Sequence, residues 1–314
     1  MRIAVLDDYQ RAAHRFADWN ALGAEVVFRQ DHLDTTEALV AALDGFDVVV
    51  AMRERTPFTA ERFAALPALR LLVTTGMANA SVDLEAARRH GVTVCGTESP
   101  AHATAELTWG LILSLTRHIH QEAAGMRRGE WQHSVGGDLD GRTLGIVGLG
   151  RLGARVAAIG TAFGMRVLAW STHLDPARAA EHGALAVDKE ELFSASDVVT
   201  VHYKLSERST GLVGARELAR MKPTALLVNT SRGPLVDTPA LVAALREGRI
   251  AGAALDVYDT EPLPPRDELR TLPNTLLTPH LGYVTEATYD VFYRQAAEDI
   301  AAFRDGTPLR VLTS

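Results

Sequence analysis

The chain has 314 residues, of which 47% are hydrophobic and 23% charged, and its formal net charge is -7. This length suits two domains, and the hydrophobic content supports large buried cores and argues against disorder. The moderate negative charge gives no electrostatic reason to bind nucleic acid or an anionic membrane, and no apolar stretch is long enough to span a bilayer. Cys95 is the only cysteine, which excludes an intrachain disulfide and favours a reducing compartment. We therefore expect a soluble, cytoplasmic protein.

Short β-rich runs alternate with alanine-rich helical stretches, which is the pattern of parallel α/β domains. In the first hundred residues, strands are expected at Ile3–Leu6, Glu25–Phe28, Asp47–Ala51, Leu69–Thr74 and Val92–Cys95. Helices are expected between them, at Gln10–Asn20, Thr36–Leu43, Thr59–Leu66 and Val82–His90. Five strands with intervening helices make one complete small α/β domain.

A longer helix is expected from Thr104 to about His120, followed by a polar, glycine-containing stretch from Gly125 to Gly141. We interpret this helix as the bridge into a second α/β domain. The strands of that domain are expected at Thr143–Val147, Arg166–Trp170, Ala184–Val187, Asp197–His202, Ala225–Asn229, Ala251–Val257 and Thr275–Thr278. The last helix, from Thr285 to about Arg304, could return to the first domain. The predicted fold class is α/β with two doubly wound parallel sheets.

A glycine loop, G-L-G-R-L-G at 148–153, lies between an expected strand and a helix from Arg151 to Ala162. Gly148 permits the tight turn, Gly150 lets the backbone approach a pyrophosphate, and Gly153 lets the helix lie close to the sheet. The motif alone is weak evidence, because glycine pairs also make ordinary turns. Its strand–turn–helix context predicts a dinucleotide site.

The position that reads the adenosine ribose is Ser171, at the end of the second strand of this domain. A carboxylate at this place would bind the ribose hydroxyls of NAD. Serine neither repels the 2′-phosphate of NADP nor offers it a cation. The residues therefore leave the choice between NAD and NADP open.

Three chemically different side chains follow three expected strands: Arg232, Glu261 and His280. Ligands bind at the carboxyl ends of parallel strands. The guanidinium suits bidentate contact with a carboxylate and a neighbouring keto oxygen, and the imidazole can give or take a proton. A glutamate beside the imidazole keeps it charged when it acts as an acid.

Taken singly, each side chain also has an ordinary explanation, as a surface ion pair, a solvated charge or a structural histidine. Their convergence on one sheet edge predicts hydride transfer between a nicotinamide and a 2-keto or 2-hydroxy acid. No cysteine or histidine spacing indicates a metal site.

These motifs resemble those of the D-isomer-specific 2-hydroxyacid dehydrogenases, the family of D-lactate, D-glycerate and D-3-phosphoglycerate dehydrogenases. The resemblance covers essentially the whole chain and is most specific in G-L-G-R-L-G, V-N-T-S-R-G-P-L-V-D, A-A-L-D-V-Y-D-T-E-P and T-P-H-L-G-Y. It implies a flavodoxin-like substrate domain formed by residues 1–99 and 285–314, and a Rossmann-type cofactor domain formed by residues 100–284. It also implies NAD or NADP as cofactor, a small 2-keto or D-2-hydroxy acid as substrate, and a homodimer joined through the cofactor domains.

The resemblance further assigns roles to single residues. Arg232, Glu261 and His280 match the catalytic set of the family. The implied cofactor contacts are Gly148, Gly150, Arg151, Leu152 and Gly153 at the pyrophosphate, Ser171 and Tyr203, Thr230 and Ser231 by the nicotinamide ribose, and Asp256 and Gly282 near the carboxamide. For Asp256 the alternative is a buried structural carboxylate, and for Tyr203 it is simple packing.

The substrate-carboxylate loop of the family maps to 76–81, where backbone amides of Met77, Ala78 and Asn79 would bind the substrate together with Arg232. Arg53 is a further candidate for an anionic group, or else a partner in a salt bridge. Ala78 and the residues after it depart from the glycine–aspartate pattern of the family, and Ser171 replaces its acidic residue. The predicted function is an NAD(P)-dependent oxidoreductase of small 2-keto or D-2-hydroxy acids. The alternative is a dinucleotide-sensing binding protein, like the corepressors of the family, without physiological turnover.

Overall fold

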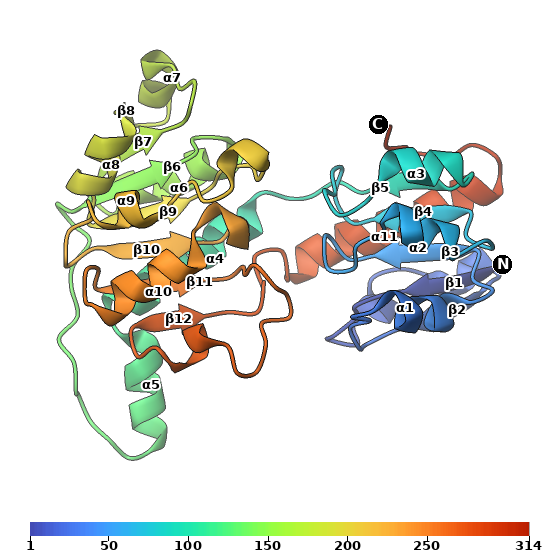
Figure 1. Cartoon of the computed structure of the whole chain (residues 1–314), viewed down its shortest axis with the longest axis horizontal. Coiled ribbons are helices and arrows are strands. Elements are labelled where there is room, and N and C mark those ends of the chain that lie inside the picture. The colour runs from blue at the N-terminus through green and yellow to red at the C-terminus, as the bar shows by residue number, and fades with distance from the viewer. Residues whose placement is uncertain (314) are drawn as a thin grey trace. The chain divides into compact units, whose positions relative to one another are not determined.

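The computed structural model describes residues 1–313 and contains two compact units (Figure 1). Unit 1 combines Met1–Pro100 with the segment that begins at Val284, and unit 2 holds Ala101–Tyr283. Each unit is built on its own parallel sheet, so the predicted α/β class with two parallel sheets is confirmed. Among residues 1–313, no helix combines the length and the hydropathy that crossing a bilayer requires.

The sheet of unit 1 has the order β2-β1-β3-β4-β5, with all neighbours parallel. Its strands are β1 (Arg2–Val5), β2 (Glu25–Phe28), β3 (Val48–Ala51), β4 (Leu71–Thr74) and β5 (Thr93–Gly96). The helices of the unit are α1 (Thr36–Leu43), α2 (Ala60–Ala64), α3 (Leu84–Arg89) and α11 (Glu286–Arg304). Every residue of β3 and β4 is buried, as expected for strands that helices cover on both faces.

The predicted helix at Gln10–Asn20 is wrong. This segment forms two short 3₁₀ turns, η1 (Ala13–Arg15) and η2 (Trp19–Leu22). Asp8 Oδ1 accepts hydrogen bonds from the amides of Ala12 (2.8 Å) and Ala13 (3.2 Å), and the indole of Trp19 donates to the Ala13 carbonyl at 2.9 Å. The Ala13 carbonyl, which a continuous helix would bond to the amide four residues later, thus accepts from a side chain instead.

The sheet of unit 2 has the order β12-β11-β10-β9-β6-β7-β8, again with all neighbours parallel. Its strands are β6 (Thr143–Val147), β7 (Arg166–Trp170), β8 (Leu185–Ala186), β9 (Val198–Val201), β10 (Leu226–Asn229), β11 (Gly252–Leu255) and β12 (Thr275–Leu277). The strand order reverses between β6 and β9. In open α/β sheets, ligands bind outside the carboxyl ends of the strands at such a switch point.

Helices cover both faces of this sheet (Figure 1). One face carries α4 (His102–Thr116), α6 (Arg151–Ala162) and α7 (Pro176–Glu181), and the other carries α8 (Lys189–Ala195), α9 (Ala215–Leu218) and α10 (Thr238–Arg246). Short 3₁₀ turns lie in the loops: η3 (Glu207–Ser209), η4 (Gly233–Leu235) and η5 (Glu268–Thr271). Along the strands, alternate residues enter the two cores: Ile146 and Val228 pack with α4 and α6, whereas Val147 and Leu227 pack with α8 and α10.

The long helix expected from Thr104 to about His120 is present but ends four residues earlier than expected. The structure ends α4 at Thr116, and a separate helix, α5, follows at Ile119–Arg127. The break lies at His118, whose φ of 53° belongs to the left-handed region and cannot continue a right-handed helix. We call α5 and residues 128–138 the arm.

The end of the arm is held by one carboxylate. Glu122 on α5 accepts hydrogen bonds from the amides of His133 (3.1 Å) and Ser134 (2.8 Å) and from the Ser134 hydroxyl (2.6 Å). The arm nevertheless presents large apolar side chains to solvent: Trp131 is 73% exposed and Val135 is 95% exposed.

Candidate functional site

The three predicted catalytic residues follow three adjacent strands. Arg232 comes after β10, Glu261 after β11 and His280 after β12, and the register pairs Asn229 with Leu255 and Leu255 with Leu277. The strands therefore end level with one another. Their carboxyl ends form a single edge of the sheet of unit 2, where the sequence predicts that these residues converge.

His280 and Glu261 form a direct pair. His280 Nδ1 lies 2.6 Å from Glu261 Oε2, and Glu261 Oε1 accepts a hydrogen bond from the Tyr258 amide at 2.9 Å. The side chains are only 15% and 25% exposed, respectively. An ionised carboxylate can only accept a hydrogen bond, so with Glu261 ionised the ring donates through Nδ1 and leaves Nε2 available to give or take a proton.

The backbone around His280 is held by a buried carboxylate. His280 has a φ of 54°, a conformation that needs support from its surroundings. Asp256 is 0% exposed and accepts three hydrogen bonds from this loop: Thr278 Oγ1 at 2.6 Å, the Leu281 amide at 2.7 Å and the Gly282 amide at 2.9 Å. Burial raises the pKa of the Asp256 carboxyl above its ordinary value, and these donors and His280 oppose that rise. The two oxygens of Asp256 thus shape the loop that places His280.

Arg232 is presented by a tight turn after β10. Its Nη1 donates to the Ser231 carbonyl at 2.7 Å, and the Asn229 side chain bridges the turn by donating to the Arg232 carbonyl (2.9 Å) and accepting from the Ser231 amide (3.0 Å). A Cβ on the next residue, Gly233, would lie 2.1 Å from the carbonyl carbon of Tyr258. Glycine therefore lets the Arg232 turn pack directly against the loop that leads to Glu261.

The three glycines of the loop differ in why a side chain is absent: two are required by close packing, and one is not. A Cβ on Gly148 would lie 2.6 Å from the His202 carbonyl oxygen, and one on Gly153 would lie 2.2 Å from the Gly148 carbonyl oxygen. A Cβ on Gly150 would meet no atom within 4 Å. Packing within residues 1–313 therefore requires the first and third glycines but not the second, which leaves room beside the backbone for a phosphate.

The helix that follows is suited to an anion. Gly150 caps α6 without a side chain that could accept from the first helical amides. These amides point at the space beside the loop, and Arg151 is exposed and Leu152 half-buried in the first turn. The residues present therefore fit the pyrophosphate of a dinucleotide.

Neutral side chains lie at the end of β7, where the sequence predicts the contact with adenosine. Ser171 Oγ accepts a hydrogen bond from the Leu149 amide at 3.1 Å, so the serine ties β7 to the glycine loop. The Trp170 and Tyr203 rings stack, with centroids 5.9 Å apart, and the Tyr203 hydroxyl lies 2.6 Å from Thr172 Oγ1. Tyr203 therefore packs against β7 and also reaches the residue next to Ser171, the predicted contact with the ribose. The contact with Thr172 could not be predicted from the sequence, because it depends on the meeting of two loops.

The two residues that follow β10, Thr230 and Ser231, use their hydroxyl groups to contact neighbouring elements. Thr230 is 5% exposed, and its Oγ1 lies 2.8 Å from Thr108 Oγ1 on α4. Ser231 Oγ donates to the Tyr203 carbonyl at 2.7 Å. Gly282 contacts α4 as well, because its carbonyl accepts from Thr104 Oγ1 at 2.9 Å. Sequence reasoning missed both threonines of α4, although hydroxyls four residues apart on an apolar helix were a usable signal.

The predicted substrate loop belongs to unit 1. The Asn79 side chain is fully used within the unit: it donates to the Arg53 carbonyl (2.7 Å) and to Thr74 Oγ1 (2.8 Å), and it accepts from the Ser81 amide. Met77 and Ala78 are exposed, and within residues 1–313 their amides donate to no protein acceptor. Such amides, rather than side chains, are the groups available for an anion.

Arg53 lies directly beside this loop. It donates to the Thr75 carbonyl at 2.8 Å and pairs with Glu54 at 3.6 Å. A Cβ on Gly76 would fall 1.7 Å from Arg53 Nη1, so the guanidinium rests against the glycine. The salt bridge expected as one alternative for Arg53 is present.

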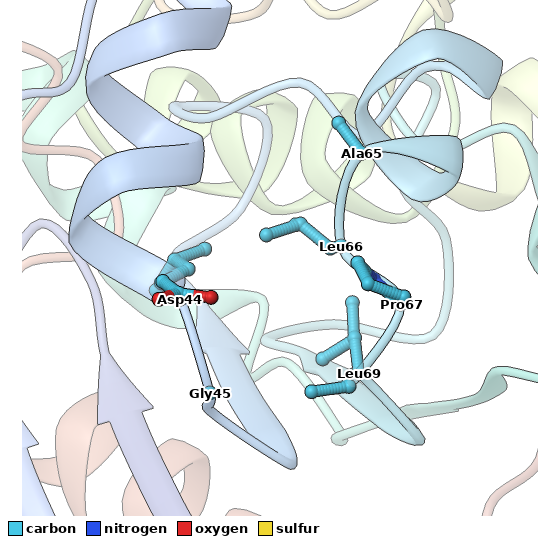
Figure 2. A pocket seen from close by; sticks show the side chains of 8 residues that line it. Asp44, Gly45, Ala65, Leu66, Pro67 and Leu69 are labelled. Carbon is cyan, nitrogen blue, oxygen red and sulfur yellow. The ribbon is translucent and has the colours of Figure 1, made fainter.

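A shallow hollow beside α10 and η5, lined by Thr238, Val242 and Arg246 among others, has a volume of about 330 Å³. A pocket between the end of α1 and the loop after α2, lined by Asp44, Gly45 and Leu66 among others, holds about 20 Å³ (Figure 2). That is space for roughly one water molecule. Within residues 1–313, no group of three or more histidine, cysteine, aspartate or glutamate side chains could hold a metal ion.

Comparison with known proteins gives consistent matches. The family profile described as D-isomer specific 2-hydroxyacid dehydrogenase, NAD binding domain, matches residues 109–282. A glyoxylate reductase of Aeropyrum pernix is 42% identical over 250 residues, which cover 76% of this chain and 75% of that protein. A D-3-phosphoglycerate dehydrogenase of Bacillus subtilis is 34% identical over 91% of this chain and 56% of its own length. The crystal structure of a phosphoglycerate oxidoreductase from Vibrio cholerae superposes with a TM-score of 0.94, at 38% identity, over 98% of this chain and 99% of that one.

Proposed function

The chain belongs to the D-isomer specific 2-hydroxyacid dehydrogenases, and from this premise we propose that it reduces a small 2-keto acid, glyoxylate or a close relative, with NADH. As a member of the family it is an NAD-dependent oxidoreductase of 2-hydroxy acids. The observation that carries the proposal is the 2.6 Å His280–Glu261 pair on the sheet edge that also bears Arg232. The glyoxylate reductase relatives support the choice of a small substrate.

The chemistry divides among three side chains. Bound NADH supplies the hydride that reaches the carbonyl carbon. Arg232 binds the substrate carboxylate and polarises the carbonyl oxygen through its planar fork. His280 gives the proton on Nε2 to that oxygen, which completes the 2-hydroxy acid, and Glu261 stabilises the charged ring beforehand. Oxidation runs through the same groups in reverse, with His280 accepting the hydroxyl proton.

We assign the cofactor to unit 2, and to unit 1 a loop that adds to the substrate contact of Arg232. The cofactor contacts proposed are the glycine loop with Arg151 and Leu152, the residues Ser171 and Tyr203, the hydroxyls of Thr230 and Ser231, and Asp256 with Gly282. The amides of Met77, Ala78 and Asn79 are the proposed anion-binding loop of unit 1. The open space at Gly150 and the amides of Met77 and Ala78, which donate to no acceptor within residues 1–313, support these assignments.

The direct test is an assay of NADH and NADPH side by side, with glyoxylate, hydroxypyruvate, pyruvate and a bulkier 2-keto acid. We expect turnover with NADH, and a higher kcat/KM for the small substrates. The ratio of kcat/KM with NADH to that with NADPH measures how far neutral Ser171 discriminates between the two cofactors. Tight binding of NADH without turnover of any substrate would contradict the proposal and favour the dinucleotide-sensing alternative.

Substitution of Gly150 by alanine should harm cofactor binding but not folding. The added methyl has no protein atom within 4 Å, so the melting temperature should change by no more than about 2 °C. Where a phosphate must approach, the same methyl costs about 1–3 kcal/mol, so the Kd for NADH should rise roughly 10- to 100-fold. Calorimetric titration and thermal unfolding measure the two effects.

Gly153→Ala is the matched contrast, because its methyl would lie 2.2 Å from the Gly148 carbonyl oxygen and should lower the melting temperature itself. An unchanged NADH affinity in Gly150→Ala would place the pyrophosphate elsewhere.

We also propose a homodimer formed through the arm and a cytoplasmic location. The exposure of Trp131 and Val135, on a segment that Glu122 keeps ordered, suits burial against a second copy of the chain. The native mass measured by light scattering, of one chain or two, tests the homodimer.

The single cysteine, Cys95, is buried and unpaired with another thiol, which supports the cytoplasmic location, and cell fractionation tests it.

A further inference from the structure

Two threonines of α4 contact the loops that carry Arg232 and His280. Thr108 Oγ1 lies 2.8 Å from the Thr104 carbonyl and 2.8 Å from Thr230 Oγ1, and Thr104 Oγ1 donates to the Gly282 carbonyl at 2.9 Å. Thr104 and Thr108 are one helical turn apart and so lie on one face of α4. Thr108 is 0% exposed and Thr230 is 5% exposed, so water does not substitute for these contacts.

The direction of each hydrogen bond follows from counting protons. A threonine hydroxyl has a single proton, and a carbonyl oxygen has none. The Thr108 proton must therefore lie on its contact with the Thr104 carbonyl, because the reverse arrangement would bring two acceptors together at 2.8 Å. The remaining contact, between Thr108 and Thr230, then takes its proton from Thr230.

The same count applies to the neighbouring residue. Ser231 Oγ gives its one proton to the Tyr203 carbonyl at 2.7 Å. Thr230 and Ser231 have thus both spent their protons inside the protein. To any ligand on their open side they present lone pairs only, and they can bind it only by accepting hydrogen bonds.

We infer that Thr108 is a positioning residue that fixes the Thr230 hydroxyl as an acceptor for a ribose hydroxyl of the cofactor. This inference rests on the proposed function, which places Thr230 and Ser231 beside the nicotinamide ribose. The two ribose hydroxyls can both donate, so a pair of acceptors on adjacent residues complements them. Without Thr108, the Thr230 hydroxyl turns freely and must lose that freedom when the ribose binds.

The experiment compares ligands that contain the nicotinamide ribose with one that lacks it. NADH and ADP-ribose carry this ribose, whereas ADP ends at the pyrophosphate. Thr108→Val keeps the shape and removes the hydroxyl, and Thr108→Ser keeps the hydroxyl. We expect Thr108→Val to raise the Kd for NADH and ADP-ribose about 3- to 10-fold, the usual effect of one hydrogen bond, and to leave the Kd for ADP unchanged. Thr108→Ser should restore the affinity for ADP-ribose.

Thr116→Val is the control on the same helix, because the buried Thr116 hydroxyl has no hydrogen-bond partner among residues 1–313 and its loss should change none of the three affinities. The inference is overturned if Thr108→Val weakens ADP as much as ADP-ribose, or if Thr108→Ser binds as weakly as Thr108→Val. Either result would indicate a packing role. Because the readout is affinity, a failure of the proposed reduction appears separately, as absent turnover in the wild-type assay.

Discussion

His280→Ala should lower the kcat for reduction of a 2-keto acid by about 10²–10⁴-fold at neutral pH, the usual contribution of a positioned general acid. The ring is held by Glu261 at 2.6 Å and offers Nε2 to the substrate, and alanine removes the proton donor while leaving Arg232 in place. The Kd for NADH should stay within a few-fold of the wild-type value. Steady-state kinetics with NADH and glyoxylate, together with a titration of NADH, measure both quantities.

His90→Ala is the matched control, since His90 is exposed at the end of α3 in unit 1 and should leave kcat unchanged. A His280→Ala enzyme with a rate near that of the wild type would refute the role of His280 as proton donor. A loss of NADH binding as large as the loss of kcat would instead indicate damage to the loop that Asp256 holds.

Arg232→Lys should lower kcat/KM for the 2-keto acid by about 10- to 100-fold, because an ammonium keeps the charge but loses one of two charge-assisted hydrogen bonds. Arg232→Ala removes both bonds and should cost about 10²–10⁴-fold. The KM for the keto acid should rise in both variants. The Kd for NADH should hardly change, since the guanidinium acts on the substrate. Kinetics over a range of glyoxylate concentrations separate KM from kcat.

Arg249→Lys offers the comparison at an exposed arginine after α10, where the same exchange should have no kinetic effect. If Arg232→Lys kept the wild-type kcat/KM, the proposed bidentate contact with the substrate would be wrong. The half-buried position of Arg232 in a turn braced by Asn229 makes a compensating movement of the backbone unfavourable.

The strands could be predicted because parallel strands buried on both faces leave a strong signal. Each forms a short apolar run between turn residues, and in unit 1 the expected bounds lie within two residues of those observed. The helix expected at Gln10–Asn20 failed because of hydrogen bonds between side chains and backbone groups close in sequence. Asp8 accepts from the Ala12 amide and the Trp19 indole donates to the Ala13 carbonyl, and the spacing of apolar residues does not reveal such bonds. The break at His118 depends on one positive φ that the residue type does not announce.

In the candidate site, too, some features could be predicted from the sequence and others could not. Three reactive side chains after three strands could be placed on one edge from the sequence, because the carboxyl ends of parallel strands meet. The carboxylate of Asp256 could be noticed but its three loop contacts could not, since they depend on the path of residues 278–282. Thr104 and Thr108 lie in a helix that reads as core. Their partners come from loops more than a hundred residues away in sequence, and no local pattern connects them.

His280 follows one strand, but the residues that orient its side chain follow the neighbouring strand. His280 follows β12, a three-residue strand at the border of the sheet. Both groups that orient it, Glu261 on the ring and Asp256 on the backbone, follow β11. Transfer of the β12 loop alone into another scaffold would therefore move the imidazole but lose the hydrogen bonds that orient it. The transferable module is the β11–β12 pair with both of its loops.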